Sequence, residues 1–492
     1  MYGIDGADRR IFDYFEMPFY EELSKTFSFL NVEEDLLNRG WSEIATGRIG
    51  KDTGGLYMSP DLDGTHGFSM TYSMAEVPSK TDARFLWDEI GADIKVGIMN
   101  VPSLNPVPKV NGFVVGSAGA GISRISRIGP EIAFPESVAK YLDEAGYVPD
   151  IRVGPSGITE IQTLFSELKK METVRIRCFI DLIEKNDIQF GFLIDRATAV
   201  VQYLFMSEIK AMMDRDRGLA SDFEPTPLIE SLLRDFYSFI DKNIQKLFEV
   251  LGGNQFILVS DHGQEAMTHH LNPNVLLQKG GYYFPGVMGG GSTFGRLYRY
   301  FFSSVPRKYR AWIRNQLSSL AVDRIEKIGV GFDKRRTKAF SHWYMPGIYI
   351  NDERFYSVVK GPDKEEVVLD ICYLINNDPK SQECGISASP YRELYSDSVY
   401  SDALPDIKIN MPDSIFVTCR SDEFVSKNPG YGPVPDLNKV QSDMHTGSKA
   451  RNPICLIDPK SASLLKDAHG VFDLTVVNVL VKSFFRNGCD NV

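Results

Sequence analysis

The sequence predicts an α/β protein with three layers, in which helices cover both faces of a mostly parallel central sheet. Short apolar runs of strand length alternate along the chain with longer amphipathic stretches of helical period. Such a β–α–β–α order needs crossover connections, which place consecutive strands parallel to one another.

The elements behind this prediction follow one another in the middle of the chain. The run "IKVGIMNVP" from Ile94 indicates a buried strand, and the stretch from Ile158 to Lys185 has apolar residues at helical spacings of three and four. "IQFGFLID" from Ile188 indicates the next strand, and a second helical pattern starts at Thr226. "NQFILVSDHG" from Asn254 then predicts a third strand.

Composition places the chain among ordinary globular proteins. It has 492 residues, of which 43% are apolar and 24% charged, enough for a large core. The formal net charge of −11 argues against a nucleic-acid polymer as partner. The six cysteines form no CxxC motif, and no signal peptide or membrane-spanning run is visible, so we expect a cytoplasmic protein.

A change of amino-acid composition between residues 282 and 335 predicts a helical insertion or lid. The predicted core consists of residues 1–281 and 336–492. This segment opens with a glycine-rich stretch and continues as basic, aromatic helical sequence. Gly289–Gly291 is not followed by GKT or GKS, so a hinge is the better interpretation than a phosphate-binding loop.

Three acidic residues come directly after predicted strands. Asp5 follows "MYGI", Asp195 follows "FGFLI", and Asp261 follows "FILVS", with His262 next in sequence. In a parallel sheet, ligands gather at the carboxyl ends of the strands. Carboxylates and an imidazole gathered there predict a site for zinc, manganese or iron, although each acid alone also suits a helix cap.

These motifs resemble the alkaline phosphatase superfamily, and most closely its type I phosphodiesterase/nucleotide pyrophosphatase branch. The similar segments occur in the family's order along the chain: "GIDGA" from Gly3, "WSEIATG" from Trp41, "THGF" from Thr65, "FLIDR" from Phe192, "VSDHG" from Val259 and "MHTGS" from Met444. The resemblance implies an alkaline-phosphatase-like fold. It also implies metal-dependent hydrolysis of a small phosphoester, with a nucleotide-like diester preferred over a monoester.

The resemblance further implies two divalent metals, zinc or manganese. One would be held by Asp5, Asp261 and His262, and the other by Asp195 and His445. Two such metals stabilise the entering and leaving oxygens of an in-line displacement.

Two departures from the family concern the nucleophile and the second metal. The family's threonine or serine nucleophile maps to Leu37, beside Asn38, and Ser42 is the nearest hydroxyl. Asn38 and Ser42 are therefore weak candidates. The family histidine four residues after the mid-chain acid maps to Ala199, or to Tyr203 if the segment is longer.

His269 and His270 are alternative candidates for the missing ligand, but solvated loop residues are the better interpretation of both. His66 fits the family's His-Gly position, and Arg48 and Lys51 are candidate anion contacts, although surface basic residues usually bind nothing specific.

Three outcomes stay open: hydrolysis by a hydroxide on a bound cation, phosphoryl-type transfer to a second substrate, or a degenerate protein that binds its ligand without turnover. A sulfatase is disfavoured, because no Cys/Ser-x-Pro-x-Arg element lies near Trp41.

Overall fold

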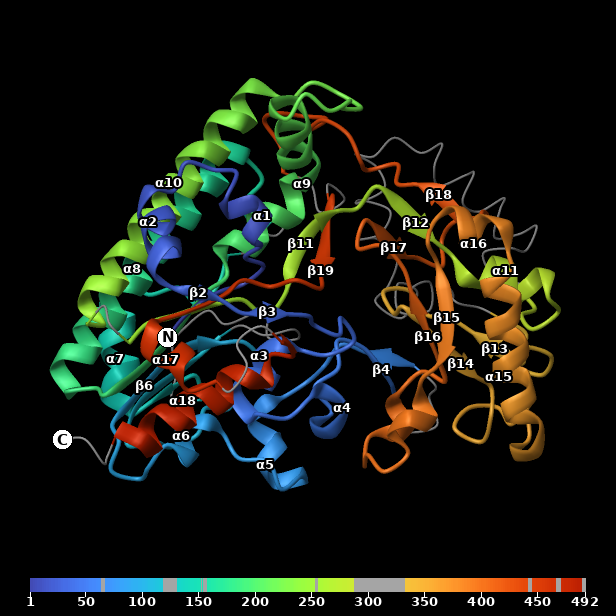
Figure 1. Ribbon diagram of the computed structural model, residues 1–492, viewed down its shortest axis with the longest axis horizontal. Coiled ribbons are helices and arrows are strands. Elements are labelled where there is room, and N and C mark those ends of the chain that lie inside the picture. Colours follow the sequence, from blue (N-terminus) through green and yellow to red (C-terminus); the bar gives the residue numbers. More distant parts are fainter. Residues whose placement is uncertain are drawn as a thin grey trace. The chain divides into compact units, whose positions relative to one another are not determined.

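The computed structural model describes residues 1–62, 67–117, 131–151, 153, 157–252, 255–286, 332–440, 445–465 and 470–488. Its contacts divide the chain into two compact units (Figure 1). The first contains residues 1–57, 70–267 and 429–492, and the second contains residues 58–69 and 268–428.

A sheet of eight strands, counted over the described residues, runs through the first unit in the order β2-β20-β10-β1-β9-β6-β7-β8. Its strands are β1 (Tyr2–Ile4), β2 (Ser28–Phe29), β6 (Val96–Val101), β7 (Gly112–Gly116), β8 (Ala133–Phe134), β9 (Phe190–Asp195), β10 (Ile257–Val259) and β20 (Cys455–Ile457). The five central strands from β10 to β7 are parallel, and the three outer strands are antiparallel to their neighbours. The predicted mostly parallel sheet is confirmed.

Helices pack on both faces of this sheet and complete the three layers (Figure 1). One face is covered by α1 (Arg9–Phe12), α2 (Pro18–Thr26), α7 (Glu136–Glu144), α8 (Ile161–Asn186), α9 (Ala197–Asp216) and α10 (Pro227–Val250). The other carries α3 (Gly40–Thr46), α6 (Leu86–Glu89) and α18 (Thr475–Gly488). The short helix α5 (Val77–Lys80) precedes α6 in the chain. Alternate strand residues point to opposite faces, so Leu193 joins one core and Ile194 the other.

The remaining elements of the first unit are short. They are α4 (Gly50–Thr53), η1 (Met74–Glu76), α17 (Pro459–Ser463), and the strand pairs β3 (Asn31–Val32) with β21 (Val471–Phe472) and β11 (Gly263–Ala266) with β19 (Gly447–Ala450). The β11–β19 pair continues from the end of β10 and brings residues of the late chain beside it.

The second unit has its own apolar core beneath small sheets. Its strands are β4 (Ser59–Pro60), β5 (Phe68–Ser69), β12 (His269–Leu271), β13 (Ala339–Phe340), β14 (Gly347–Ile350), β15 (Ser387–Pro390), β16 (Ile407–Asn410), β17 (Ile415–Val417) and β18 (Val425–Lys427). Its helices are α11 (Pro273–Lys279), α15 (Gly361–Asn376), α16 (Pro379–Glu383), η2 (Arg392–Tyr395) and η3 (Ser401–Ala403).

The predicted insertion at 282–335 falls mostly on residues 287–331, including Gly289–Gly291, which lie outside the described residues. The boundaries 1–281 and 336–492 therefore stay a prediction. Within the described ranges, no helix has the length and apolar character needed to cross a membrane.

Candidate metal centre

Neighbouring parallel strands bring three predicted ligands together. Strand β1 pairs with β10 on one side and with β9 on the other. Asp5 leaves the carboxyl end of β1, and Asp261 and His262 leave the carboxyl end of β10. Because both strands run in the same direction, their ends meet at one edge of the sheet.

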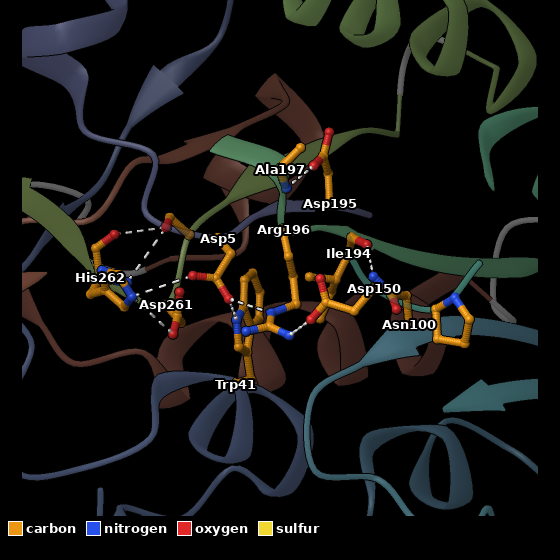
Figure 2. Close-up of polar contacts among 12 residues, drawn as sticks. Asp5, Trp41, Asn100, Asp150, Ile194, Asp195, Arg196, Ala197, Asp261 and His262 are labelled. Atoms are coloured by element: carbon orange, nitrogen blue, oxygen red, sulfur yellow. Dashed lines mark hydrogen bonds and ion pairs between the residues drawn. The ribbon is translucent and has the colours of Figure 1, made fainter. Parts of the chain in front are cut away.

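The three side chains form a compact and buried cluster (Figure 2). Each offers one ligand atom, and these atoms lie within 4.8 Å of one another. His262 Nε2 lies 3.4 Å from Asp5 Oδ1 and 3.6 Å from Asp261 Oδ2. All three residues are at most 6% exposed, so water screens their charges poorly.

The donor atoms of the cluster fit a divalent metal. His262 Nδ1 lies 2.7 Å from the carbonyl oxygen of Gly263, a contact in which Nδ1 carries the proton and Nε2 keeps its lone pair. His262 Nε2 and Asp261 Oδ1 are buried and have no hydrogen-bond partner within the described part of the chain. A lone pair that faces two carboxylates is unfavourable unless a cation lies between them, and carboxylate–imidazole sets suit zinc or manganese.

Hydrogen bonds from two aromatic side chains orient the acids. Trp41 Nε1 donates to Asp5 Oδ2 at 3.2 Å, and the Tyr57 hydroxyl donates to Asp261 Oδ2 at 3.3 Å. Partners of this kind fix the direction of metal ligands in known sites.

Two glycines allow the close approaches that this arrangement needs. A Cβ atom at Gly3 would lie 2.6 Å from the Trp41 ring, so a side chain there would displace the indole. A Cβ atom at Gly40 would lie 2.4 Å from the carbonyl oxygen of Asp261, because α3 starts against this loop.

Two basic side chains also contact the cluster. Arg196, directly after β9, places Nε 3.4 Å from Asp5 Oδ2 and Nη1 2.6 Å from Asp150 Oδ2 (Figure 2). Lys449, on β19, places Nζ 3.9 Å from Asp261 Oδ2 and lies 3.5 Å from the Tyr57 ring centre.

The surroundings of the two acids shift their pKa values in opposite directions. Burial acts to raise the pKa of Asp5, but the basic side chains of His262, Arg196 and Lys449 around it lower it below its usual value. Burial and the charge of Asp5 raise the pKa of Asp261. Burial lowers the pKa of Lys449 to about 8, although both carboxylates oppose this shift. Asp5 is therefore the firmly ionised acid of the pair.

Asp195 does not join the cluster. Its Oδ2 accepts a hydrogen bond from the Tyr2 hydroxyl at 3.1 Å, and its Oδ1 accepts one from the backbone N–H of Ala197 at 2.7 Å. In Figure 2 the carboxylate of Asp195 points away from Asp5, whereas the side chain of Arg196 extends toward Asp5. The side chain is fully buried, and burial raises its pKa.

His445, the other predicted ligand of a second metal, is exposed and stacks on Tyr203 with ring centres 5.2 Å apart. Tyr203 lies on α9, and its ring centre is 6.3 Å from that of His262. Of the two alternatives for the family histidine, Tyr203 is thus the one near the cluster. Ala199 is buried on the same helix. Among the described side chains of His, Cys, Asp and Glu, Asp195 and His445 belong to no convergent group of three.

The candidates for the nucleophile differ in their surroundings. Leu37 and Asn38 are buried, and the Oδ1 atom of Asn38 has no hydrogen-bond partner among the described residues. Ser42 lies on α3, and its hydroxyl is 2.6 Å from the Tyr72 hydroxyl. The Tyr57 hydroxyl contacts the carboxylate of Asp261, and the Ser260 hydroxyl donates to the carbonyl oxygen of His262 at 2.7 Å.

The remaining candidates belong to other elements or lie outside the described residues. Arg48 pairs with Asp82 at 3.3 Å on the surface, and Lys51 lies on α4. His66 lies outside the described residues. His269 and His270 form part of β12 in the second unit rather than a loop.

A second pair of buried acids lies near the cluster. Glu34 is 2% exposed and Glu43 is 1% exposed. Burial, and then the charge of Glu43, raise the pKa of Glu34 well above its usual value. Burial likewise raises the pKa of Glu43 to about 8. Glu43 Oε1 accepts a hydrogen bond from the backbone N–H of Gly50 at 2.9 Å, so Glu43 also holds the loop after α3.

Sequence reasoning missed Trp41, Tyr57, Arg196 and Lys449 as residues of this site. Arg196 had a usable signal, because it is the next residue after a strand-end acid and successive side chains point in different directions. Trp41, Tyr57 and Lys449 reach the site from segments whose placement depends on the tertiary fold.

Comparison with known proteins supports the fold. No family model and no curated protein matches the chain. Among solved structures, the phosphonoacetate hydrolase of Sinorhizobium meliloti 1021 in complex with phosphonoacetate is similar at a TM-score of 0.52 and 11% identity, over 98% of this chain and 94% of that one. Its complex with phosphonoformate gives a TM-score of 0.51 and 12% identity over the same shares.

Murine ectonucleotide pyrophosphatase/phosphodiesterase 5 has a TM-score of 0.47 and 13% identity, over 99% of this chain and 94% of that one. At such identities the likeness concerns the fold. The chain therefore has the alkaline-phosphatase-like α/β fold that its motifs predicted.

Proposed function

We propose that the protein is a metal-dependent hydrolase of small phosphoesters. One observation carries this proposal: Asp5, Asp261 and His262 converge at the carboxyl edge of the parallel sheet, with two buried donor atoms that lack partners. The likeness to phosphonoacetate hydrolase gives further support, because that protein's substrate carries a phosphonate group, whose oxygens resemble those of a phosphoester.

Asp5, Asp261 and His262 would hold the metal. When bound, a divalent cation supplies Lewis-acid polarisation of a phosphoryl oxygen and stabilises the charge that develops there. The protein orients the ligand side chains and places positive charge beside them. Trp41 and Tyr57 fix the two carboxylates, and Lys449 places a positive charge beside Asp261.

We infer that water, rather than a side chain, attacks the phosphorus atom. Leu37 carries no nucleophilic group, Asn38 is a poor nucleophile, and the Ser42 hydroxyl is engaged by Tyr72. This substitution of the family's nucleophile is the departure with the greatest chemical consequence.

The second candidate function is ligand binding without turnover in the same fold. The leucine at the nucleophile position favours it, because a metal and basic residues can bind a phosphoryl group without cleaving it.

Turnover of bis(p-nitrophenyl) phosphate and p-nitrophenyl phosphate, each with added zinc or manganese, tests the proposal. We expect metal-dependent release of p-nitrophenol that falls roughly 100-fold or more in Asp261→Asn, since a ligand and a fixed charge are lost. Asp187→Asn is the matched control: Asp187 caps α8 in the left-handed region with φ 51°, which asparagine tolerates. Turnover equal in both variants would refute this site, and metal and phosphate binding with no turnover would establish the second candidate.

A further inference from the structure

We propose that the site binds one divalent metal, and that the Arg196 guanidinium takes the place of a second metal and binds a phosphoryl oxygen of the substrate. This inference rests on the proposed function and goes further, because it assigns the metal number and a substrate-binding residue.

The acid that would hold a second metal already has a hydrogen-bond donor at each of its two oxygens. Asp195 accepts one hydrogen bond at each carboxylate oxygen, from Tyr2 and from the backbone of Ala197. Both donors are buried with it, so turning the carboxylate toward Asp5 would leave buried polar groups without partners. Asp195 therefore serves the fold around the end of β9.

The next residue in sequence supplies a positive charge to the cluster instead. Arg196 reaches Asp5 through Nε at 3.4 Å and Asp150 through Nη1 at 2.6 Å (Figure 2). Two carboxylates hold the guanidinium on different sides, which fixes its plane. An arginine held in this way is preorganised, so it loses little conformational entropy when it binds an anion.

Charge balance at the cluster also favours a single metal. The carboxylates of Asp5, Asp150 and Asp261 lie against the cations Arg196 and Lys449. One divalent cation makes this group net positive, which suits a phosphoryl anion. A second divalent cation that shared Asp5 would lie beside the guanidinium, where burial strengthens the repulsion.

The position of Arg196 allows contact with a substrate. Its side chain is 27% exposed, whereas the ligands Asp5, Asp261 and His262 have side chains at most 9% exposed. A guanidinium carries five N–H donors in one plane and matches the oxygen geometry of a phosphoryl group. We infer that Arg196 and the metal contact different oxygens of the same group.

Metal counting and phosphate binding test the two parts separately. The purified protein is saturated with zinc, passed through a desalting column and analysed by inductively coupled plasma mass spectrometry, with one zinc per chain expected. Calorimetric titration of the zinc-loaded protein with inorganic phosphate then compares Arg196→Ala, Arg196→Lys and Arg177→Ala. Arg177 is the matched control, an arginine on α8 that donates to the carbonyl oxygen of Ala145.

We expect phosphate to bind Arg196→Ala roughly tenfold or more weakly than the parent protein, with Arg196→Lys in between and Arg177→Ala unchanged. Circular dichroism of each variant shows that the fold is retained, and the lysine variant keeps the charge if alanine disturbs folding. Two zinc ions per chain in the parent protein would overturn the metal assignment. Equal phosphate affinity in Arg196→Ala and Arg177→Ala would overturn the role of the guanidinium. A different result would refute the proposed function, namely the absence of metal-dependent turnover in the parent protein.

Discussion

The Nε1 atom of Trp41 donates a 3.2 Å hydrogen bond to Asp5, and the same indole packs against the backbone of Gly3 in β1, the strand directly before Asp5. One side chain thus supports both the ligand and the strand that carries it. Trp41 belongs to the core between α3 and the sheet, so the orientation of Asp5 depends on how that helix packs.

Replacing Trp41 with phenylalanine removes the donor and retains an aromatic ring. We expect Trp41→Phe to bind zinc roughly 10- to 100-fold more weakly, as for other residues that orient metal ligands. Competition with a chromophoric chelator measures this affinity. Trp87→Phe is the control, because the Trp87 indole N–H is buried without a partner among the described residues and stacks on Phe85. Equal zinc affinity in both variants would contradict the role of Trp41.

We expect the Tyr57 hydroxyl to orient Asp261 and not to attack the substrate. Tyr57→Phe removes one hydrogen bond to Asp261 and keeps the ring beneath Lys449. We expect turnover to fall roughly tenfold, in line with the loss of one hydrogen bond to a charged group. A loss beyond about a thousandfold in the kcat of bis(p-nitrophenyl) phosphate hydrolysis would show that the hydroxyl takes part in the chemistry.

Asp195 is expected to affect stability and not metal content. Asp195→Ala leaves the Tyr2 hydroxyl and the Ala197 N–H buried without their partner. Each orphaned group costs about 1–3 kcal/mol, so urea denaturation should show a clear decrease in the free energy of unfolding. The zinc content after desalting should stay at one per chain. A drop in zinc content without loss of stability would identify Asp195 as a ligand.

The buried pair Glu34 and Glu43 predicts a pH dependence of stability. The pKa of Glu43 is raised from 4.5 to about 8 by burial, so the folded state binds its proton more tightly than the unfolded state does. Stability is then full below the unfolded pKa and is lost as the pH rises toward the folded pKa. We expect the free energy of unfolding to decrease between pH 5 and about 8, by an amount on the order of a few kcal/mol.

Glu43→Gln should flatten this dependence, since its amide keeps an acceptor for the N–H of Gly50 and cannot ionise. Urea denaturation at several pH values measures the slope. The exposed Glu22→Gln on α2 serves as the control and should leave the slope unchanged. A parent protein whose stability rises over this pH range would contradict the assignment.

Much of the fold was predictable because long periodic segments are strong signals. The helix expected from Ile158 is α8, Ile161–Asn186, and the one expected from Thr226 is α10, Pro227–Val250. The strands expected from Ile94, Ile188 and Asn254 are β6, β9 and β10. The second unit was not foreseen, because its strands are short and some of them, such as β12 and β17, pair across large sequence distances.

The residues of the site that directly follow strands were predictable from the sequence. Asp5, Asp261 and His262 come together because β1 and β10 are parallel neighbours. Asp195 also ends a strand, but the direction of its carboxylate depends on the Tyr2 hydroxyl across the sheet, which no local pattern reveals. The inference from resemblance that Asp195 and His445 share a metal stays a prediction.

The position of β1 has a consequence for how the protein folds. This three-residue strand lies in the middle of the sheet, and its two neighbours are β9 and β10. Both are synthesised long after residues 2–4, so β1 cannot pair with its neighbours until the chain has been made as far as β10. Such non-local pairing slows folding, and the centre of the sheet is expected to assemble late.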